Sequence, residues 1–280
     1  MTETSDFIII GAGVYGAATA WHLASHDTSV TVFEAGEIGS RASGGPGRRG
    51  VRANGRDVRE LALMKRAYGI WPTLHERLEA PAFYEQCGHL LLAESHTQVQ
   101  ALEARAWMQR AQGIETKFLN SFEVRKHEPN LSDKITAALY CPNDGVANHS
   151  ATTQAYATAA TRLGAKFYTS TPVKSLECKQ GRASAIFTMD GRRHAAKRGI
   201  LILANAGVRT LIGTRQPLPV WDECLQVLIS APMASVPFTH LTGHIARTVS
   251  LKIHGNDRVM ISGGWHGCWD SSTNTGCTKK

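Results

Sequence analysis

An α/β fold is expected for this chain of 280 residues because of three features near its beginning. Residues 6–11 are almost continuously apolar, which is typical of a parallel strand buried on both faces. A glycine-rich turn follows directly and leads into an alanine-rich helix. The segment SVTVFE then supplies a second apolar strand that ends at Glu34. Strand, helix and strand in this order predict a βαβ unit of a parallel sheet.

The turn between the first strand and the helix has the glycine spacing of a dinucleotide site. Gly11 permits the tight turn, Gly13 lets the backbone approach the phosphates, and Gly16 lets the helix pack closely on the strand. The helix N-terminus would direct its N–H groups and positive dipole end at the pyrophosphate. Glu34, about 20 residues further on, would accept hydrogen bonds from ribose hydroxyls and disfavours the 2′-phosphate of NADP. The sequence therefore predicts a Rossmann-like dinucleotide-binding domain.

The overall composition is typical of an ordered cytoplasmic protein. Hydrophobic residues make up 42% of the chain, which is enough to bury a core. There is no apolar run of the roughly 20 residues that a membrane helix needs, and no basic region precedes an apolar stretch at the N-terminus. The net charge of +8 comes from scattered basic residues, a pattern that favours a solvated surface over a nucleic-acid partner.

The six cysteines lie far apart and include no C-x-x-C pair. They are Cys87, Cys141, Cys178, Cys224, Cys268 and Cys277. This spacing argues against a metal site and against a disulfide framework, and reduced thiols suit a cytosolic enzyme.

A second glycine-rich loop, EAGEIGSRASGGPGRRGVR, bears on which dinucleotide is bound. An NAD dehydrogenase would normally continue here with another helix and strand of its sheet. A loop instead suits a backbone that wraps the far half of a longer cofactor. The chain also lacks the Y-x-x-x-K pair of the short-chain reductases, which removes the commonest NAD-dependent enzymes of this length.

With this loop, the sequence resembles the FAD-dependent amine and amino-acid oxidoreductases of the D-amino-acid oxidase, glycine oxidase and sarcosine oxidase group. The resemblance covers essentially the whole chain, and it rests on GAGVYG, the strand end at Glu34, ASGG at 42–45, CGHLLLAE from 87, NHSATTQAYATAATRLGAKFYTSTPVKSLE and RGILILANAGVRT. It implies FAD as the cofactor. It also implies that a small amino acid or secondary amine passes a hydride from its C–N carbon to the flavin and becomes an imine. Oxygen or another acceptor would then take the electrons.

The resemblance also assigns cofactor contacts to individual residues. Those at the pyrophosphate and adenosine ribose are Gly11, Gly13, Val14, Tyr15, Gly16, Glu34 and Ala35. Those along the ribityl chain toward the flavin are Ala42, Ser43, Gly47, Arg48 and Arg49. Val173 would contact the adenine end through its backbone, and Ala204 and Gly207 would form a second close approach to FAD.

The basic run GRRGVR supplies the candidate catalytic residues. Arg49 and Arg52 match the arginine-x-x-arginine segment that sarcosine oxidases place beside the flavin. By this resemblance Arg52 would hold a substrate carboxylate through a bidentate pair, and Arg49 would stabilise negative charge on the reduced flavin. His254 and His266 could also line the pocket, although a lone histidine is more often structural. No metal ligand is expected.

Two interleaved domains are expected. The FAD-binding domain would contain residues 1–85 and 145–215, and an α+β substrate domain would contain residues 86–144 and 216–280. The alternation in TVSLKIHGNDRVMISGG predicts an antiparallel hairpin that turns at HGND, within a mixed or antiparallel sheet covering the flavin. The last dozen residues are polar and predict neither strand nor helix.

The family normally carries a further C-terminal stretch, with a glycine-rich turn and a helix near the pyrimidine edge of the flavin. Because no such stretch follows the hairpin, the expectation is a truncated chain or a flavin site that a partner chain completes. Two alternatives stay open: a catalytically incomplete FAD-binding fragment or subunit, and an NAD-dependent dehydrogenase. The expected partners are a small amine or amino-acid substrate and an electron acceptor, with neither nucleic acid nor membrane.

Overall fold

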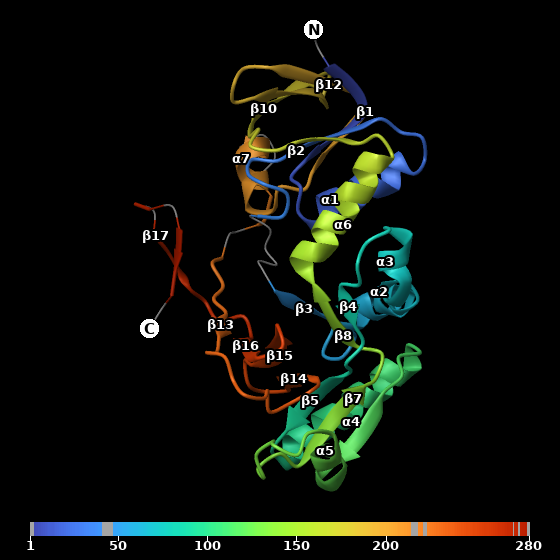
Figure 1. Cartoon of the computed structure of the whole chain (residues 1–280), viewed down its shortest axis with the longest axis vertical. Coiled ribbons are helices and arrows are strands. Elements are labelled where there is room, and N and C mark those ends of the chain that lie inside the picture. The colour runs from blue at the N-terminus through green and yellow to red at the C-terminus, as the bar shows by residue number, and fades with distance from the viewer. Residues whose placement is uncertain are drawn as a thin grey trace. The chain divides into compact units, whose positions relative to one another are not determined.

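The computed structural model describes residues 3–40, 47–213, 218–220, 223–270, 272–273 and 275–278 (Figure 1). Its contacts divide the chain into two compact units. The first unit consists of Met1–Pro46, Glu76–Pro81 and His149–Asp222. The second unit consists of Gly47–His75, Ala82–Asn148 and Glu223–Lys280.

The boundary between the units differs from the predicted domain boundary. The sequence predicts that residues 47–75 belong to the FAD-binding domain, whereas the structure places them in the second unit. Residues 82–85 and 145–148 move with them, because β3 (Arg48–Val51) and β4 (Tyr84–Glu85) both pair with β8 (Gly145–Asn148) in a three-stranded sheet. The physical reason is a shared core: Ala53 and Leu61 pack with Ile114 and Cys141, and Asn54 Nδ2 donates to the Leu139 carbonyl oxygen. Such contacts are non-local, so the order of elements along the chain does not reveal them.

The first unit is built on a six-stranded sheet with the order β10-β11-β12-β1-β2-β9. Strands β12, β1, β2 and β9 are parallel, and β10 and β11 extend the sheet as an antiparallel ribbon. The six strands are β1 (Glu3–Ile10), β2 (Val30–Phe33), β9 (Lys166–Tyr168), β10 (Val173–Lys179), β11 (Arg182–Thr188) and β12 (Arg193–Ile202). The predicted βαβ unit is confirmed, since α1 (Val14–Ala24) connects β1 to β2.

Both faces of this sheet are covered, which explains why the second half of β1, Phe7–Ile10, is continuously apolar. Helices α1 and α6 (His149–Arg162) lie side by side on one face, where Ile9 joins their buried alanines (Figure 1). Ile8 and Ile10 point to the other face, toward α7 (Val208–Ile212) and the β10–β11 ribbon. Alternate residues of one strand therefore belong to two separate cores.

The second unit contains a seven-stranded sheet with the order β13-β16-β15-β14-β5-β7-β6. The strands are β5 (His89–Ala93), β6 (Lys117–Asn120), β7 (Ala137–Cys141), β13 (Leu228–Ile229), β14 (Leu241–His244), β15 (Ser250–His254) and β16 (Arg258–Ser262). The predicted mixed sheet is confirmed, because β14 and β5 are parallel and the other neighbours are antiparallel. The predicted hairpin is present as β15 and β16.

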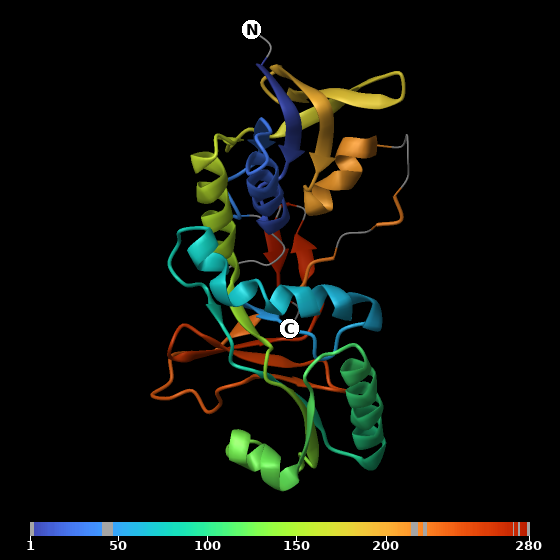
Figure 2. The same ribbon diagram turned by 90° about the vertical axis from the view of Figure 1, so that its right-hand side faces the viewer.

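Helices cover part of this second sheet. The helix α4 (His96–Ala111) packs on Leu91 and Ala93, whereas α5 (Ser121–His127) packs on the opposite face, on Leu90 and Leu92 (Figure 2). The helix α2 (Val58–Tyr68) ends shortly before Pro72, and the 3-10 turn η1 (Trp71–Thr73) and the short helix α3 (Leu74–Arg77) follow it. A proline removes one helical N–H donor, which accounts for this break.

Two expectations about the C-terminal part are wrong. The polar sequence predicts neither strand nor helix, but β17 (Cys268–Asp270) and β18 (Thr275–Cys277) form an antiparallel hairpin. Reduced thiols are also expected, whereas Cys268 and Cys277 form a disulfide with their Cα atoms 5.0 Å apart. The cause of both errors is the register, which places these two cysteines directly opposite each other although they are nine positions apart in the sequence.

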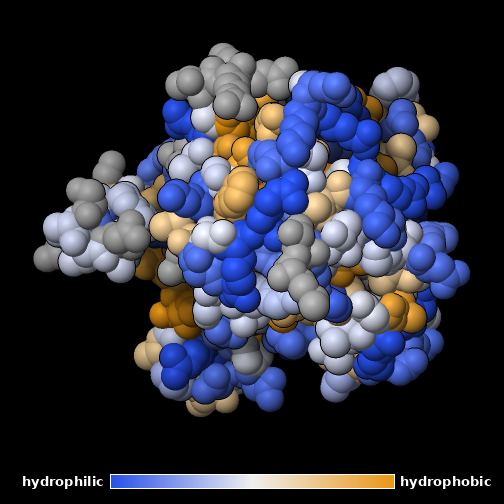
Figure 3. Space-filling model, turned by 90° about the horizontal axis from the view of Figure 1, so that it is seen from above, coloured by the Kyte–Doolittle hydropathy of each residue, from blue (hydrophilic) through white to orange (hydrophobic). Residues whose placement is uncertain are grey.

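Hydrophilic residues dominate the coloured part of the face shown in Figure 3, with small apolar patches between them. Within the described ranges, no helix combines the length and the apolar character that crossing a bilayer requires. The same part of the chain contains no group of three or more His, Cys, Asp or Glu side chains that could hold a metal ion.

Candidate flavin and anion sites

The glycine turn of the first unit is shaped for a phosphate group. Gly11 has a φ of +103°, and a Cβ there would lie 2.5 Å from the Leu203 carbonyl oxygen. A Cβ on Gly16 would lie 1.9 Å from the Gly11 carbonyl oxygen. Only glycine fits at these two positions, so the turn is held in a single tight conformation.

Helix α1 begins here with Gly13 as its N-cap, and it has neither a side-chain cap nor an acidic residue in its first turn. An anion can therefore take the positive end of this helix.

Glu34 is fixed beside this turn by backbone hydrogen bonds. Its Oε2 accepts from the Ala12 N–H at 2.7 Å, and its Oε1 accepts from the Gly36 N–H at 2.9 Å. The carboxylate thus lies next to the backbone of the glycine turn, where the sequence predicts the ribose contact. Each carboxylate oxygen has more than one acceptor position, so both can still accept hydrogen bonds from ribose hydroxyls.

The structure brings most of the other predicted contacts of the first unit close to this turn. The Cβ built on Gly11 would lie 3.1 Å from the Ala204 Cα, and Gly207 belongs to the 3-10 turn η2 (Asn205–Gly207) that follows. Two residues before Val173, the Thr171 N–H donates to the Glu34 carbonyl oxygen at 2.8 Å. Their contacts with FAD stay predictions.

Three further predicted residues are placed only by their position in the chain, and two are not described. Val14 and Tyr15 begin α1, with Tyr15 79% exposed, and Ala35 follows Glu34 at the surface. Ala42 and Ser43 lie outside the described residues.

The predicted arginines lie on β3 and just after it, in the second unit, and their partners differ. Arg48 Nη1 forms an ion pair with Glu85 Oε2 at 2.6 Å. Arg49 Nη1 donates to the Arg48 carbonyl oxygen at 2.8 Å and contacts Met260 Sδ at 3.1 Å. Arg52 Nη1 donates to the Asn54 carbonyl oxygen at 2.5 Å. Among the described residues, no carboxylate lies within ion-pair distance of Arg49 or Arg52.

A buried carboxylate fixes the backbone that follows Arg52. Asp144, which is fully buried, accepts hydrogen bonds from the Ala53 N–H at 2.7 Å and the Asn54 N–H at 3.1 Å. The Tyr68 hydroxyl donates to the same carboxylate at 2.5 Å. Burial and the Asp144 charge raise the pKa of Tyr68, so its hydroxyl keeps its proton. Asp144 is thus a positioning residue for the arginine segment.

Lys252 on β15 is the residue that the sequence reasoning missed. It is only 5% exposed, and its Nζ donates to Ser262 Oγ at 2.9 Å. Burial, together with the positive charges of Arg49 and Arg52, lowers the pKa of Lys252 to about 8. A signal was available in the strand segment SLKIH, because a lysine in the middle of a buried hairpin is rare without a role.

His254 lies on the same strand face as Lys252, two residues later. Its Nδ1 is buried without a hydrogen-bond partner. Gly47, which has a φ of +89°, packs against this ring, and a Cβ there would lie 2.7 Å from His254 Nδ1 and 2.8 Å from Met260 Cε. We call Arg49, Lys252 and His254, together with Met260 and Ser262, the basic face.

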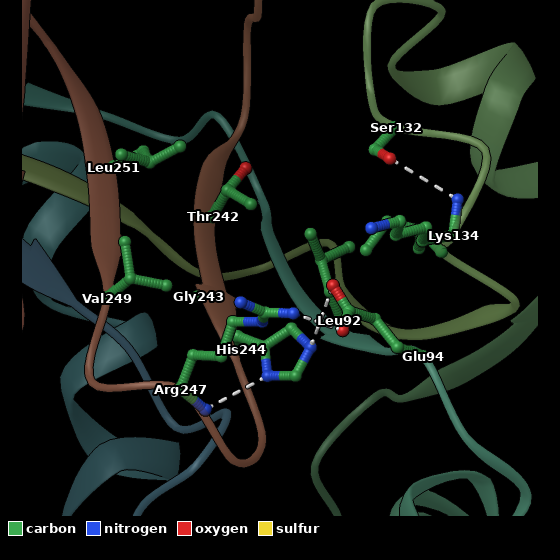
Figure 4. A pocket seen from close by; sticks show the side chains of 11 residues that line it. Leu92, Glu94, Ser132, Lys134, Thr242, Gly243, His244, Arg247, Val249 and Leu251 are labelled. Atoms are coloured by element: carbon green, nitrogen blue, oxygen red, sulfur yellow. Dashed lines mark hydrogen bonds and ion pairs between the residues drawn. The ribbon is translucent and has the colours of Figure 1, made fainter.

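A cavity of about 360 Å³ lies elsewhere in the second unit and contains none of the predicted site residues. Figure 4 shows His244 and Arg247 directed toward Glu94 at its wall, and Arg247 Nη2 pairs with Glu94 Oε2 at 2.5 Å. Leu251 lines this cavity, and because successive strand residues point to opposite faces, Lys252 belongs to the other side of the sheet. Because Arg247 is already paired with Glu94 and none of the predicted site residues lines this cavity, we do not assign the redox chemistry to it.

Comparison with known proteins agrees with the geometry of the turn. The sequence profile of a family described as FAD dependent oxidoreductase matches residues 6–276. The sarcosine oxidase subunit beta of Rhodobacter capsulatus is 27% identical over 238 residues, covering 81% of this chain and 56% of that protein. The glycine oxidase of Geobacillus kaustophilus is 28% identical over 247 residues, covering 83% of this chain and 64% of that protein.

Solved structures show the same fold. The L-proline dehydrogenase from P. horikoshii superimposes with a TM-score of 0.85 at 24% identity, over 95% of this chain and 71% of that one. The glycine oxidase structure from Geobacillus kaustophilus gives a TM-score of 0.79 at 24% identity, over 96% and 74%. This chain spans between half and two thirds of the length of the two curated relatives named above. Since the family profile extends over almost the whole sequence, the chain belongs to the FAD-dependent oxidoreductases of the D-amino-acid oxidase type.

Proposed function

We propose that this chain binds FAD and, in the complete enzyme, oxidises the C–N bond of a small amino acid or secondary amine. The observation that carries the proposal is the turn of the first unit, where Gly11 and Gly16 admit no side chain and Glu34 is tied to the Ala12 N–H. The family profile supports FAD over a nicotinamide, so the NAD-dependent alternative loses its support.

Bound FAD would supply the hydride acceptor. The substrate loses a hydride from the carbon that bears nitrogen and a proton from the nitrogen, and water hydrolyses the resulting imine. Oxygen or another acceptor takes up the two electrons. The protein needs no strong general base for this reaction, because its main contribution is to orient the substrate and to stabilise charge.

The arginines are the residues that we propose for this contribution. Arg52 would hold the substrate carboxylate and Arg49 would stabilise negative charge on the reduced flavin. Burial lowers the pKa of both guanidinium groups, yet both stay charged because arginine titrates far above neutral pH. Partly buried cations without a carboxylate partner are suited to receive an anion from a ligand.

A second candidate function is a chain that holds FAD but oxidises substrate only with a partner chain. One observation favours it: the Rhodobacter relative, 27% identical to this chain, is named a beta subunit. In this case FAD would bind, but no amine alone would reduce it.

The visible spectrum of the purified protein, before and after addition of FAD, tests cofactor binding. We expect the absorption of an oxidised flavin to stay with the protein through gel filtration. Anaerobic addition of sarcosine, glycine, proline and D-amino acids should then bleach it. Protein that never takes up FAD contradicts the proposal, and FAD binding without bleaching selects the second candidate.

A further inference from the structure

We propose that the basic face binds a second carboxylate of the substrate, so that the preferred substrates are amino acids with two carboxylate groups. This inference rests on the proposed function, since it specifies the substrate class of that reaction. Arg52 is left for the first carboxylate, and Lys252, Arg49 and His254 surround the second. All of these residues belong to the second unit.

Lys252 carries the argument because its ammonium group is buried without an anion. An ammonium group has three N–H donors, and only Ser262 Oγ accepts from this one, at 2.9 Å. The residue is 5% exposed, so water cannot freely solvate the two remaining donors. Buried lysines are almost always paired, since an isolated buried charge is very costly. Among the described residues, no carboxylate forms an ion pair with Lys252. A ligand carboxylate would supply the missing partner.

The strand register brings Arg49 to the same place. Lys252 is directly opposite Met260 in the β15–β16 pair, so their side chains share a face of the sheet. Arg49 Nη1 lies 3.1 Å from Met260 Sδ. The Arg49 guanidinium therefore lies at the Met260 side chain, on the face of the sheet that carries Lys252. Sulfur is a weak acceptor and does not neutralise this cation.

His254 completes the basic face with an unused ring nitrogen. Its Nδ1 is buried without a partner, and Gly47 lets the backbone pack closely against the ring. Opposite His254 on β16 is Arg258, a further basic residue. No acidic residue takes part in the β15–β16 pairing, whose members are Ser250–His254 and Arg258–Ser262. Such a one-sided charge distribution favours an anionic ligand.

The number of charges favours two carboxylates over one. Arg49, Arg52 and Lys252 provide three positive charges at neutral pH, since even the lowered pKa of Lys252, about 8, lies above 7. A monocarboxylate offers one negative charge and reduced flavin offers another. A second carboxylate balances the third cation, and its two oxygens can accept from both Lys252 and Arg49.

Binding of simple carboxylates to the purified chain tests the inference without a reaction. Calorimetric titrations would use malonate and succinate, which carry two carboxylates, and acetate, which carries one. We expect the better dicarboxylate to bind at least about tenfold more tightly than acetate. Lys252→Met should remove this difference, whereas Lys252→Arg should keep most of it. Equal binding of all three anions by the unaltered chain would overturn the inference.

Lys117→Met is the matched control, because Lys117 belongs to the same unit but its side chain is 59% exposed. This variant loses the same charge and should keep the preference for the dicarboxylate. If Lys252→Met and Lys117→Met lost the preference for the dicarboxylate equally, the preference would depend on net charge alone. This result would contradict a specific site at Lys252. Circular dichroism of each variant shows whether it is folded.

Substrate selectivity provides a second readout after FAD is added. Sarcosine and iminodiacetate share a glycine core and differ by one carboxylate, so the ratio of their rates of flavin bleaching isolates the second group. We expect iminodiacetate to be preferred about tenfold or more, with the ratio falling toward one in Lys252→Met. If sarcosine and iminodiacetate bleach the flavin of the unaltered chain at equal rates, the inference of a second carboxylate site is contradicted, but the proposed function is not. If no amine bleaches the flavin, the proposed catalytic function fails, and the carboxylate titration still decides the inference.

Discussion

The glycine turn of the first unit and the basic face of the second are built in opposite ways. The turn consists of backbone: Gly11 and Gly16 are tightly enclosed, and the Glu34 carboxylate is held by main-chain N–H groups. The basic face consists of side chains that come from strands about 200 positions apart in the sequence, with Arg49 contacting Met260 across a sequence separation of 211. The turn therefore depends on the absence of side chains at two positions, and the basic face depends on charge. Substitutions that add a side chain should damage the turn, and substitutions that remove a charge should damage the basic face.

The largest effect is expected from Gly16→Ala. The added Cβ would lie 1.9 Å from the Gly11 carbonyl oxygen, so α1 or the turn must move. We expect a loss of about 3–5 kcal/mol in the free energy of unfolding. We also expect at least about 100-fold weaker FAD binding, because the phosphate-binding N–H groups move with the helix. Urea unfolding and flavin fluorescence titration measure the two quantities.

Gly199→Ala in the same unit is the control for this variant. A Cβ there would lie 3.5 Å from the nearest Phe7 ring carbon, which is an ordinary contact. Its effect on FAD binding should be less than twofold. If Gly16→Ala were as mild as this control, the tight turn would not be what binds the cofactor.

Asp144→Asn should give the next largest effect, and it should act only on the second unit. The carboxylate accepts from two backbone N–H groups and the Tyr68 hydroxyl, whereas the amide has only one acceptor oxygen and turns N–H donors toward groups that also donate. We expect a loss of about 3 kcal/mol, measured by urea unfolding. Asp57→Asn is the control, because Asp57 is an exposed helix cap that asparagine can replace at a cost of a few tenths of a kcal/mol. A similar cost for both variants would contradict a positioning role for Asp144.

The contrast between the two sites also shows what could be predicted from sequence. Gly11, Gly16 and Glu34 are close in sequence and belong to one local βαβ unit, so the turn and the position of Glu34 beside it were predictable. The mixed sheet and the β15–β16 hairpin were predictable as well, from alternation and a glycine-containing turn. In both cases the signal lies within one short segment.

The features that could not be predicted from sequence depend on contacts between distant segments. Lys252 is one lysine among many until β3 and β16 are packed around it, and Asp144 has no motif that marks it as the acceptor for the backbone after Arg52. The transfer of residues 47–75 to the second unit follows from the packing of Ala53 and Leu61 with Ile114 and Cys141, which no local periodicity reveals. The Cys268–Cys277 disulfide likewise follows from a hairpin register rather than from a spacing motif.

The lowered pKa of Lys252 predicts that the free energy of unfolding depends on pH, an effect that a site built from backbone should not show. Its pKa is lowered from 10.5 to about 8, so between these values the unfolded chain binds more protons than the folded one. Stability therefore rises with pH across this window, and Lys252 should contribute about 3 kcal/mol to that rise. Urea unfolding at pH values of about 7 and about 10 measures it.

The variant Lys252→Met should lack this contribution, while Lys117→Met should keep it because that side chain is 59% exposed. A saturating dicarboxylate should also reduce it, since an anion favours the protonated ammonium in the folded state. A stability profile that is identical in the unaltered chain and in Lys252→Met would show that Lys252 titrates normally, and the burial argument would then fail.

The smallest effect is expected from Arg48→Gln, which distinguishes the two roles open to this residue. The resemblance predicts a contact with FAD, whereas the structure pairs Arg48 with Glu85 in a bond whose side chains are 28% and 52% exposed. If the ion pair is its whole role, FAD affinity should change less than twofold and stability by at most about 0.5 kcal/mol, as for other surface pairs. Glu85→Gln should then cost the same, and the double variant should cost no more than either single one. A tenfold loss of FAD affinity in Arg48→Gln but not in Glu85→Gln would instead assign Arg48 to the cofactor, and the cofactor site would include a side chain of the second unit.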